Sequence, residues 1–194
     1  MRKITLHDIL DIAQYERVRP ERLKAVIAHK QARRLQLGPS MWFAFETFET
    51  MLHQVQEMMR AERIVDEKRI QREIEVFNEL IPDKHQLSAT LFIAITDETQ
   101  RKEFLQQAID LPEHTFLSLN GTRLTFNFDP RQNLFDRLGT VQFVSLRLTP
   151  QQVAAFADPA SSILIGFDHP LYTHAASLSP EMKAVLAKDL EREE

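Results

Sequence analysis

The sequence contains no cysteine, and only four of its 194 residues are glycine. Without cysteine the chain forms no disulfide, offers no thiolate to a zinc or iron–sulfur site, and has no thiol nucleophile. Four glycines are too few for a flexible linker or for the glycine-rich loops of nucleotide-binding proteins, and no Gly-x-Ser-x-Gly elbow is present. These absences argue against thiol, P-loop, kinase, dinucleotide-binding and serine-hydrolase chemistry.

Long hydrophobic runs are also missing. The longest ones, Met41–Phe45 and Leu91–Ile95, are far shorter than the ~20 residues of a membrane span. The N-terminal stretch lacks the apolar segment of a signal peptide, so we expect a cytoplasmic protein without a membrane association. Hydrophobic residues make up 43% and charged residues 27% of the chain, which is typical of a globular protein. We predict one domain over residues 1–194.

The charge is unevenly distributed along the chain. Its net value is −4, but residues 1–40 contain nine Lys or Arg against four Asp or Glu, which leaves +5 for this segment and −9 for the rest. The basic residues alternate with Leu23, Val26 and Ile27, a pattern typical of an amphipathic helix with a solvated face. Because no RNA-binding motif accompanies the charge, we do not expect nucleic acid as a partner.

Local signals predict the elements. Thr5 with Asp8 resembles a capped helix start and Pro20 suits the first turn of a second helix, so residues 1–40 are predicted to be a helical pair packed on the remaining α+β core. Apolar residues recur every three or four positions from Glu46 to Arg63, which predicts a helix. Further helices are expected at residues 68–80, 97–108, 150–156 and 180–192, and strands at 35–37, 41–45, 86–95, 115–119, 122–128, 140–148, 162–167 and 173–178. Together these elements predict an α+β fold, with an antiparallel or mixed sheet and helices mainly on one face.

The helix from Glu46 carries a polar stripe opposite its apolar one, formed by Glu46, Glu49, His53, Glu57 and Arg60. Carboxylates and a histidine on one helical face occur in di-iron sites. Here the Glu49-to-His53 spacing is four, whereas that motif needs three, and no second helix repeats it. We therefore expect this face to point to water.

A second polar group follows the predicted strand at 162–167. Asp168 and His169 are adjacent, and a carboxylate can fix the tautomer of an imidazole whose ordinary pKa is near neutrality. Neighbouring residues on a strand rarely face each other, and Pro170 is typical of a turn. A structural turn is the favoured interpretation.

Several motifs together resemble an uncharacterised bacterial family, domain of unknown function 3501. The motifs are ITLHDIL with Tyr15 and Arg19-Pro20, LQLGPSM after Arg33-Arg34, QVQEMMRAER at 54–63, Leu80-Ile81-Pro82, LSATL at 87–91, and Asp168-His169-Pro170 with Tyr172. The resemblance spans about residues 4–190, with His53 and Ala94 as departures from the family pattern, in which a tyrosine and an acid are usual. Family members are often encoded near rubrerythrin-like proteins and iron–sulfur oxidoreductases. The resemblance therefore implies a cytoplasmic accessory or binding protein that serves such a redox or stress system.

The polar residues of the 54–63 motif are not dictated by helix propensity. We predict binding roles for Gln54, Gln56, Glu57, Arg60 and Arg63, and for Asp168, His169 and Tyr172. One interpretation makes Glu57, Arg60 and Arg63 a recognition cluster for a planar anion, and the other makes them an intramolecular salt-bridge network that holds the helix to the sheet.

An alternative function is a metal-dependent enzyme. In this hypothesis Glu57 and His169 converge on a metal ion, and Asp168 orients the imidazole. The sequence predicts no particular cofactor.

Overall fold

The computed structural model describes residues 1–133 and 136–192. Its helices are α1 (Ile12–Gln31), α2 (Phe48–Glu62), α3 (Glu67–Asn78), α4 (Glu98–Gln107), α5 (Pro150–Ala157) and α6 (Pro180–Glu191), with short 3-10 turns at Leu6–Asp8, Leu111–His114 and Pro130–Gln132. The strands are β1 (Arg34–Leu37), β2 (Met41–Phe45), β3 (Gln86–Ile93), β4 (Thr115–Leu119), β5 (Thr122–Thr125), β6 (Asn127–Phe128), β7 (Val141–Arg147), β8 (Ile163–His169) and β9 (Tyr172–Ser177). The predicted α+β class is confirmed.

The strands form two antiparallel sheets where the sequence predicts one. Their orders are β1-β2-β3-β7-β6 and β5-β4-β8-β9. β5 and β6 follow each other on one extended segment that passes from one sheet to the other at Phe126, a buried residue. The apolar faces of the sheets pack together, and the ring of Phe43 stacks on those of Phe126 and Phe167 at centroid distances of 5.4 and 6.1 Å. The main core therefore lies between the sheets.

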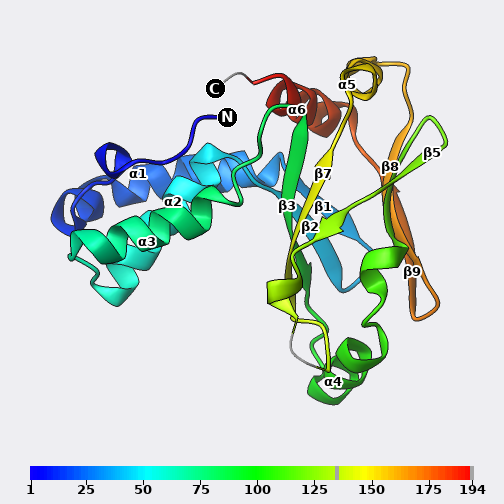
Figure 1. Ribbon diagram of the computed structural model, residues 1–194, viewed down its shortest axis with the longest axis horizontal. Coiled ribbons are helices and arrows are strands. Elements are labelled where there is room, and N and C mark those ends of the chain that lie inside the picture. Colours follow the sequence, from blue (N-terminus) through cyan, green and yellow to red (C-terminus); the bar gives the residue numbers. More distant parts are fainter. Residues whose placement is uncertain (134–135, 193–194) are drawn as a thin grey trace.

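Helices surround these sheets. In Figure 1, α5 and α6 lie at one end of the strands, α4 lies at the other, and α1, α2 and α3 stand to one side. We call α1–α3, with residues 1–11 and the connections between them, the helical arm. The arm has its own apolar cluster, in which Met51, Val55 and Met59 of α2 pack with Ile74 of α3 and Ile4. No helix in the described ranges has both the length and the hydrophobicity needed to cross a bilayer.

The predicted N-terminal helical pair is not confirmed, because α1 runs without a break through Pro20. Thr5 and Asp8 do form a capping box, but it closes only the 3-10 turn at Leu6–Asp8. α1 begins instead at the cap of Asp11, whose side chain accepts a hydrogen bond from the Gln14 amide. Pro20 removes the amide that would bond to the Glu16 carbonyl, and both residues are exposed, so water can hydrate that carbonyl.

Two buried polar groups fix the arm to α6 and to β3. Arg33, which follows α1, donates two hydrogen bonds to the carboxylate of Asp189 on α6, at 2.8 and 3.0 Å. Glu46, which precedes α2, accepts hydrogen bonds from the hydroxyls of Thr50 and of Thr90 on β3, both at 2.6 Å. Because each buried group has partners, these contacts set where α1 ends and α2 begins.

Tyr172 joins the free edges of the two sheets. Its hydroxyl donates to the Leu37 carbonyl at 2.6 Å and accepts from the Ser40 amide at 3.1 Å. Between these residues, Gly38 has a φ of +70°, and a Cβ atom at this position would lie 2.6 Å from the Tyr172 hydroxyl and 2.6 Å from two ring carbons of His174. The turn between β1 and β2 therefore needs glycine both for its backbone and for the close approach of Tyr172.

A glycine comparison tests this junction. We expect Gly38→Ala to lower the free energy of unfolding by about 2–4 kcal/mol, because alanine strains the left-handed backbone and its Cβ conflicts with the side chains of Tyr172 and His174. The control Gly121→Ala carries the strain alone, because Gly121 has a φ of +85° and nothing within 4 Å of its added Cβ, so a loss of about 1 kcal/mol is expected. Urea denaturation measures both values, and equal losses would contradict the close packing of Tyr172 and His174 against Gly38.

Candidate functional site

The polar stripe of α2 packs against α1 and does not point to water as the sequence suggests. The Tyr15 hydroxyl lies 2.7 Å from the Glu57 carboxylate and 3.2 Å from Nδ1 of His53, so α1 and α2 meet along polar side chains. Tyr15 is also the only buried residue of α1. The helical periodicity correctly predicts which residues share the stripe, but it does not predict that α1 covers this stripe.

Glu57 is the centre of these contacts. Its carboxylate accepts hydrogen bonds from the Tyr15 hydroxyl, from Nε and Nη2 of Arg19 at 2.7 and 3.0 Å, and from Nη2 of Arg60 at 3.1 Å. The hydrogen bonds from Arg19, more than those from Tyr15 and Arg60, lower the pKa of Glu57 to about 2, although burial opposes the shift. Glu57 is therefore ionised at neutral pH and holds α1 to α2.

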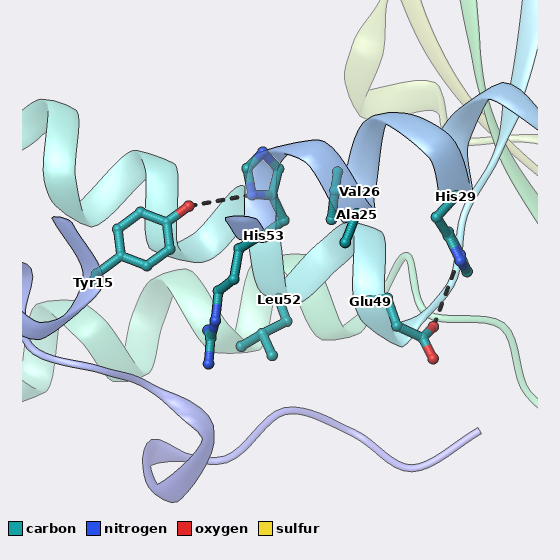
Figure 2. Close-up of a pocket in the computed structure, with 8 residues that line it drawn as sticks. Tyr15, Ala25, Val26, His29, Glu49, Leu52 and His53 are labelled. Atoms are coloured by element: carbon teal, nitrogen blue, oxygen red, sulfur yellow. Dashed lines mark hydrogen bonds and ion pairs between the residues drawn. The ribbon is translucent and has the colours of Figure 1, made fainter. Parts of the chain in front are cut away.

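A pocket of about 230 Å³ lies between α1 and α2, next to these contacts. It is lined by Tyr15, Arg22, Ala25, Val26, His29, Glu49, Leu52 and His53. Figure 2 shows polar pairs on two sides of it: Tyr15 with His53 on one side, and His29 with Glu49, 4.0 Å apart, on the other. Apolar side chains lie between the pairs. An apolar pocket with a few convergent polar groups is typical of a small-molecule site.

Both histidines of the pocket are half-buried. Burial, with the positive charge of Lys30 adding to it, lowers the pKa of His53, and burial together with Arg33 lowers the pKa of His29. Since the ordinary pKa of histidine is about 6.5, both rings are neutral at pH 7. The pocket therefore owes its charge to Arg22 and Glu49.

These two charged groups have different surroundings. Glu49 forms an ion pair with Arg192, 3.1 Å away, which offsets its negative charge. Arg22 forms no ion pair or hydrogen bond with any residue that the structure describes. The pocket thus presents one guanidinium whose hydrogen-bonding capacity is unused.

The structure brings only part of the 54–63 motif together. Glu57 and Arg60 are paired, whereas Arg63 lies beyond the end of α2, exposed and in the left-handed backbone conformation. Gln56 is buried, and its amide bonds to both the amide and the carbonyl of Leu10 at 3.0 and 3.1 Å, so it holds the segment before α1. Gln54 is half-buried and contributes no hydrogen bond among the described residues. The ion pairs of Glu57 hold α2 to α1, and not to the sheet.

Asp168, His169 and Tyr172 belong to the β8–β9 hairpin. Nδ1 of His169 accepts from the Leu171 amide at 3.1 Å, so Nε2 carries the proton and donates to Asp110 at 3.0 Å. Asp168 instead bonds to Arg123 and His114. The prediction that Asp168 orients His169 is therefore wrong, because successive strand residues project to opposite faces and Asp110 takes that role.

The structure does not bring Glu57 and His169 together as metal ligands. Glu57 lies in the helical arm, and His169 ends β8 on the other side of the β3–β7 strands (Figure 1). Both ring nitrogens of His169 are engaged, and the donors of Tyr15, Arg19 and Arg60 already occupy Glu57. Over residues 1–133 and 136–192, no group of three His, Asp or Glu side chains is arranged to hold a metal ion.

Sequence reasoning missed the residues that α1 supplies to the pocket. Tyr15, Arg22, Val26 and His29 recur at spacings of three, four and seven, so they share one face of a continuous helix. This periodicity is a signal that the sequence carries. It is hidden when Pro20 is taken as the start of a second helix.

Comparisons with known proteins show what the chain is similar to. A family model described as "Protein of unknown function (DUF3501)" matches residues 3–190. A crystal structure of a protein of unknown function from Burkholderia pseudomallei is similar over 98% of this chain and 100% of that chain, with 30% identity and a TM-score of 0.90. No curated protein matches the chain.

Substitution of Glu57 should show its ionic role as a pH dependence. Its lowered pKa implies stability that is fully present above its ordinary value of about 4.3 and is lost as the pH falls towards 2. We expect Glu57→Gln to lower the unfolding free energy by about 1–3 kcal/mol at pH 7 and by much less at pH 2.5, in urea denaturation. The control Glu62→Gln, on an exposed residue of the same helix, should change little at either pH. Equal losses from Glu57→Gln at both pH values would contradict the ionic role.

Arg63 offers a second test. Its φ of 53° and ψ of 43°, with a hydrogen bond from the Ile64 amide to the Met59 carbonyl at 2.9 Å, form a helix ending that favours glycine. Arg63→Gly should raise the unfolding free energy by about 0.5–1 kcal/mol, whereas Glu62→Gly, inside the helix, should lower it by about 1 kcal/mol. Loss of stability in Arg63→Gly would show that the arginine side chain has a structural partner.

Proposed function

Given that the chain belongs to the DUF3501 family of proteins of unknown function, we propose that its helical arm binds a small organic anion in the pocket between α1 and α2. The observation that carries this proposal is the pairing of charges. Glu49 is neutralised by Arg192, and Arg22 is left without a partner in the described residues. A guanidinium with free donors, next to apolar walls, favours a carboxylate with an apolar body.

The electrostatics of α1 support the same ligand class. α1 contains five Lys or Arg residues against two Glu residues, which gives it a net charge of +3. Burial keeps His29 and His53 neutral, so these two rings add no positive charge at pH 7. A positive helix above an apolar pocket attracts small anions and rejects cations.

The size of the pocket limits the ligand. Its volume of about 230 Å³ lies below the roughly 300–1,000 Å³ of sites for drug-sized ligands, so a metabolite with about ten non-hydrogen atoms is the expected occupant. Ala25, Val26 and Leu52 would contact its apolar part, and Arg22 its carboxylate.

The same lining offers no aliphatic hydroxyl or amine as a nucleophile. It contains no serine, threonine or lysine that could act as a nucleophile, and burial together with the hydrogen bond to Glu57 raises the pKa of Tyr15, so the phenol stays protonated. A binding protein is consistent with the accessory role that the family resemblance implies. The iron–sulfur or rubrerythrin-like partners, and the cytoplasmic location, stay predictions from the sequence.

Benzoate is a suitable first probe because it combines a carboxylate with an apolar ring and has nine non-hydrogen atoms. We expect it to bind with a Kd of about 1 mM or tighter in isothermal titration calorimetry. Arg22→Ala should weaken binding about 10–100-fold, since a hydrogen-bonded charge contributes about 1.5–3 kcal/mol, and Arg22→Lys should restore part of the loss.

The matched control is Arg17→Ala, which removes an exposed arginine from the same helix and should leave the affinity for benzoate nearly unchanged. Thermal melting of all variants checks that the arm is still folded. Equal weakening by Arg17→Ala and Arg22→Ala would mean that only the general charge of α1 attracts the anion. If neither benzoate nor a substituted benzoate binds the folded wild type, the proposed anion pocket is rejected.

A further inference from the structure

The Tyr15 hydroxyl lies between two groups that compete for its single proton. It is 2.7 Å from Oε1 of Glu57 and 3.2 Å from Nδ1 of His53. The Glu57 carboxylate is ionised and can only accept, and Nε of Arg19 already donates to the same oxygen. The phenol proton therefore goes to Glu57, and the Tyr15 oxygen is left as an acceptor towards His53.

This arrangement decides which nitrogen of His53 carries the proton. Nδ1 must donate to the Tyr15 oxygen, and a neutral imidazole has only one N–H group. The lone pair is then on Nε2, which has no hydrogen-bond partner in the part of the chain that the structure describes. Figure 2 shows Nδ1 turned towards Tyr15 and the second ring nitrogen on another side of the ring.

The contacts of the other histidine of the pocket do not fix its tautomer. Nε2 of His29 lies 2.9 Å from the Thr47 hydroxyl and 4.0 Å from the Glu49 carboxylate. Because a hydroxyl can donate to this nitrogen or accept from it, the contacts of His29 do not decide which of its ring nitrogens is the acceptor. His53 is thus the imidazole of the pocket whose contacts assign an acceptor role to its free ring nitrogen. Its free nitrogen is an acceptor, whereas Arg22 offers only donors.

We infer that Glu57 and Tyr15 hold His53 as the Nδ1–H tautomer, and that the ligand is an organic acid that also carries an O–H or N–H donor for Nε2. Hydroxy acids and amino-substituted acids belong to this class. The ligand part of the inference rests on the proposed anion pocket, whereas the tautomer does not depend on any ligand.

The tautomer is measured on the full chain without ligand, by long-range ¹H–¹⁵N NMR of the imidazole rings near pH 7. We expect a protonated Nδ1 and an unprotonated Nε2 for His53, and the signal is assigned by its loss in His53→Asn. Tyr15→Phe removes the acceptor and should shift the ring towards a mixture of tautomers. A protonated Nε2 in the wild type would overturn the inference, whatever the protein binds.

The ligand class is tested with two pairs of probes, 3- and 4-hydroxybenzoate against 3- and 4-methoxybenzoate. The methoxy compounds keep the ring and the carboxylate but have no donor. In calorimetric titrations of the wild type, at least one hydroxybenzoate should bind about 3–10-fold more tightly than its methoxy counterpart, the contribution of one hydrogen bond. If neither hydroxybenzoate binds more tightly than its methoxy counterpart, the inference that the ligand needs a donor is rejected.

Two substitutions of His53 distinguish the roles of its two ring nitrogens. His53→Asn places an amide near the position of Nδ1 and lacks an acceptor at Nε2, so we expect it to lose the preference for the hydroxybenzoate. His53→Gln places an amide oxygen near Nε2 and should keep part of the preference. A preference that survives in His53→Asn would overturn the assignment to Nε2.

The same measurements separate failure of this inference from failure of the proposed function. If benzoate and all four substituted benzoates fail to bind the folded wild type, both the anion pocket and the proposed ligand class are rejected. The NMR result alone then tests the tautomer of His53. If benzoate binds and depends on Arg22 but the hydroxyl group adds nothing, the anion pocket stands and the donor requirement is rejected.

Discussion

The arrangement of the helical arm depends on one carboxylate, that of Glu57. α1 is twenty residues long but buries only Tyr15, so apolar packing alone holds it weakly. The donors of Tyr15, Arg19 and Arg60 converge on Glu57. Tyr15 and Arg19 belong to α1, so their bonds position α1 across α2. These contacts hold α1 and α2 at the spacing that leaves the pocket between them, and they also orient the ring of His53. Hydrogen bonds to a charged group are among the stronger polar contributions to stability, which makes this arrangement effective despite the small buried area.

The two sheets provide the rigid support for this arm. Their core is formed by aromatic and aliphatic side chains that stack between them, as Phe43 does with Phe126 and Phe167. The buried contacts of Arg33 with Asp189, and of Glu46 with Thr90, tie the arm to this core on both sides of the β1–β2 hairpin. A site formed by a sparsely buried helix on a rigid scaffold is typical of ligand binding, because the least stable elements are those that can open.

The polar residues at the end of β8 have a different character from those of the pocket. Asp168 bonds to Nδ1 of His114 and to Arg123, and Asp110 bonds to His169 and lies 3.4 Å from Nε2 of His114. Every charged group in this series is already paired within the chain. Such a network stabilises the β8–β9 hairpin and leaves little capacity for a ligand, in contrast to Arg22 and Nε2 of His53.

The sequence by itself determined the elements whose signals are local. These are the helix at 48–62, from its apolar period, and the predicted strands on either side of Asn120-Gly121, whose φ values of 50° and 85° only a few residue types adopt. Tertiary structure decided the rest. Pro20 is compatible with a helix start or with an exposed helix interior, and the alternation through Phe126 is the same whether a strand stays in one sheet or changes sheets. The stripe on α2 is fixed by helix phase, but its environment depends on Tyr15, which is 42 residues away from Glu57. Burial, pKa and tautomer are set by neighbours that only the folded chain brings together, and so the pocket could not be predicted from the order of residues alone.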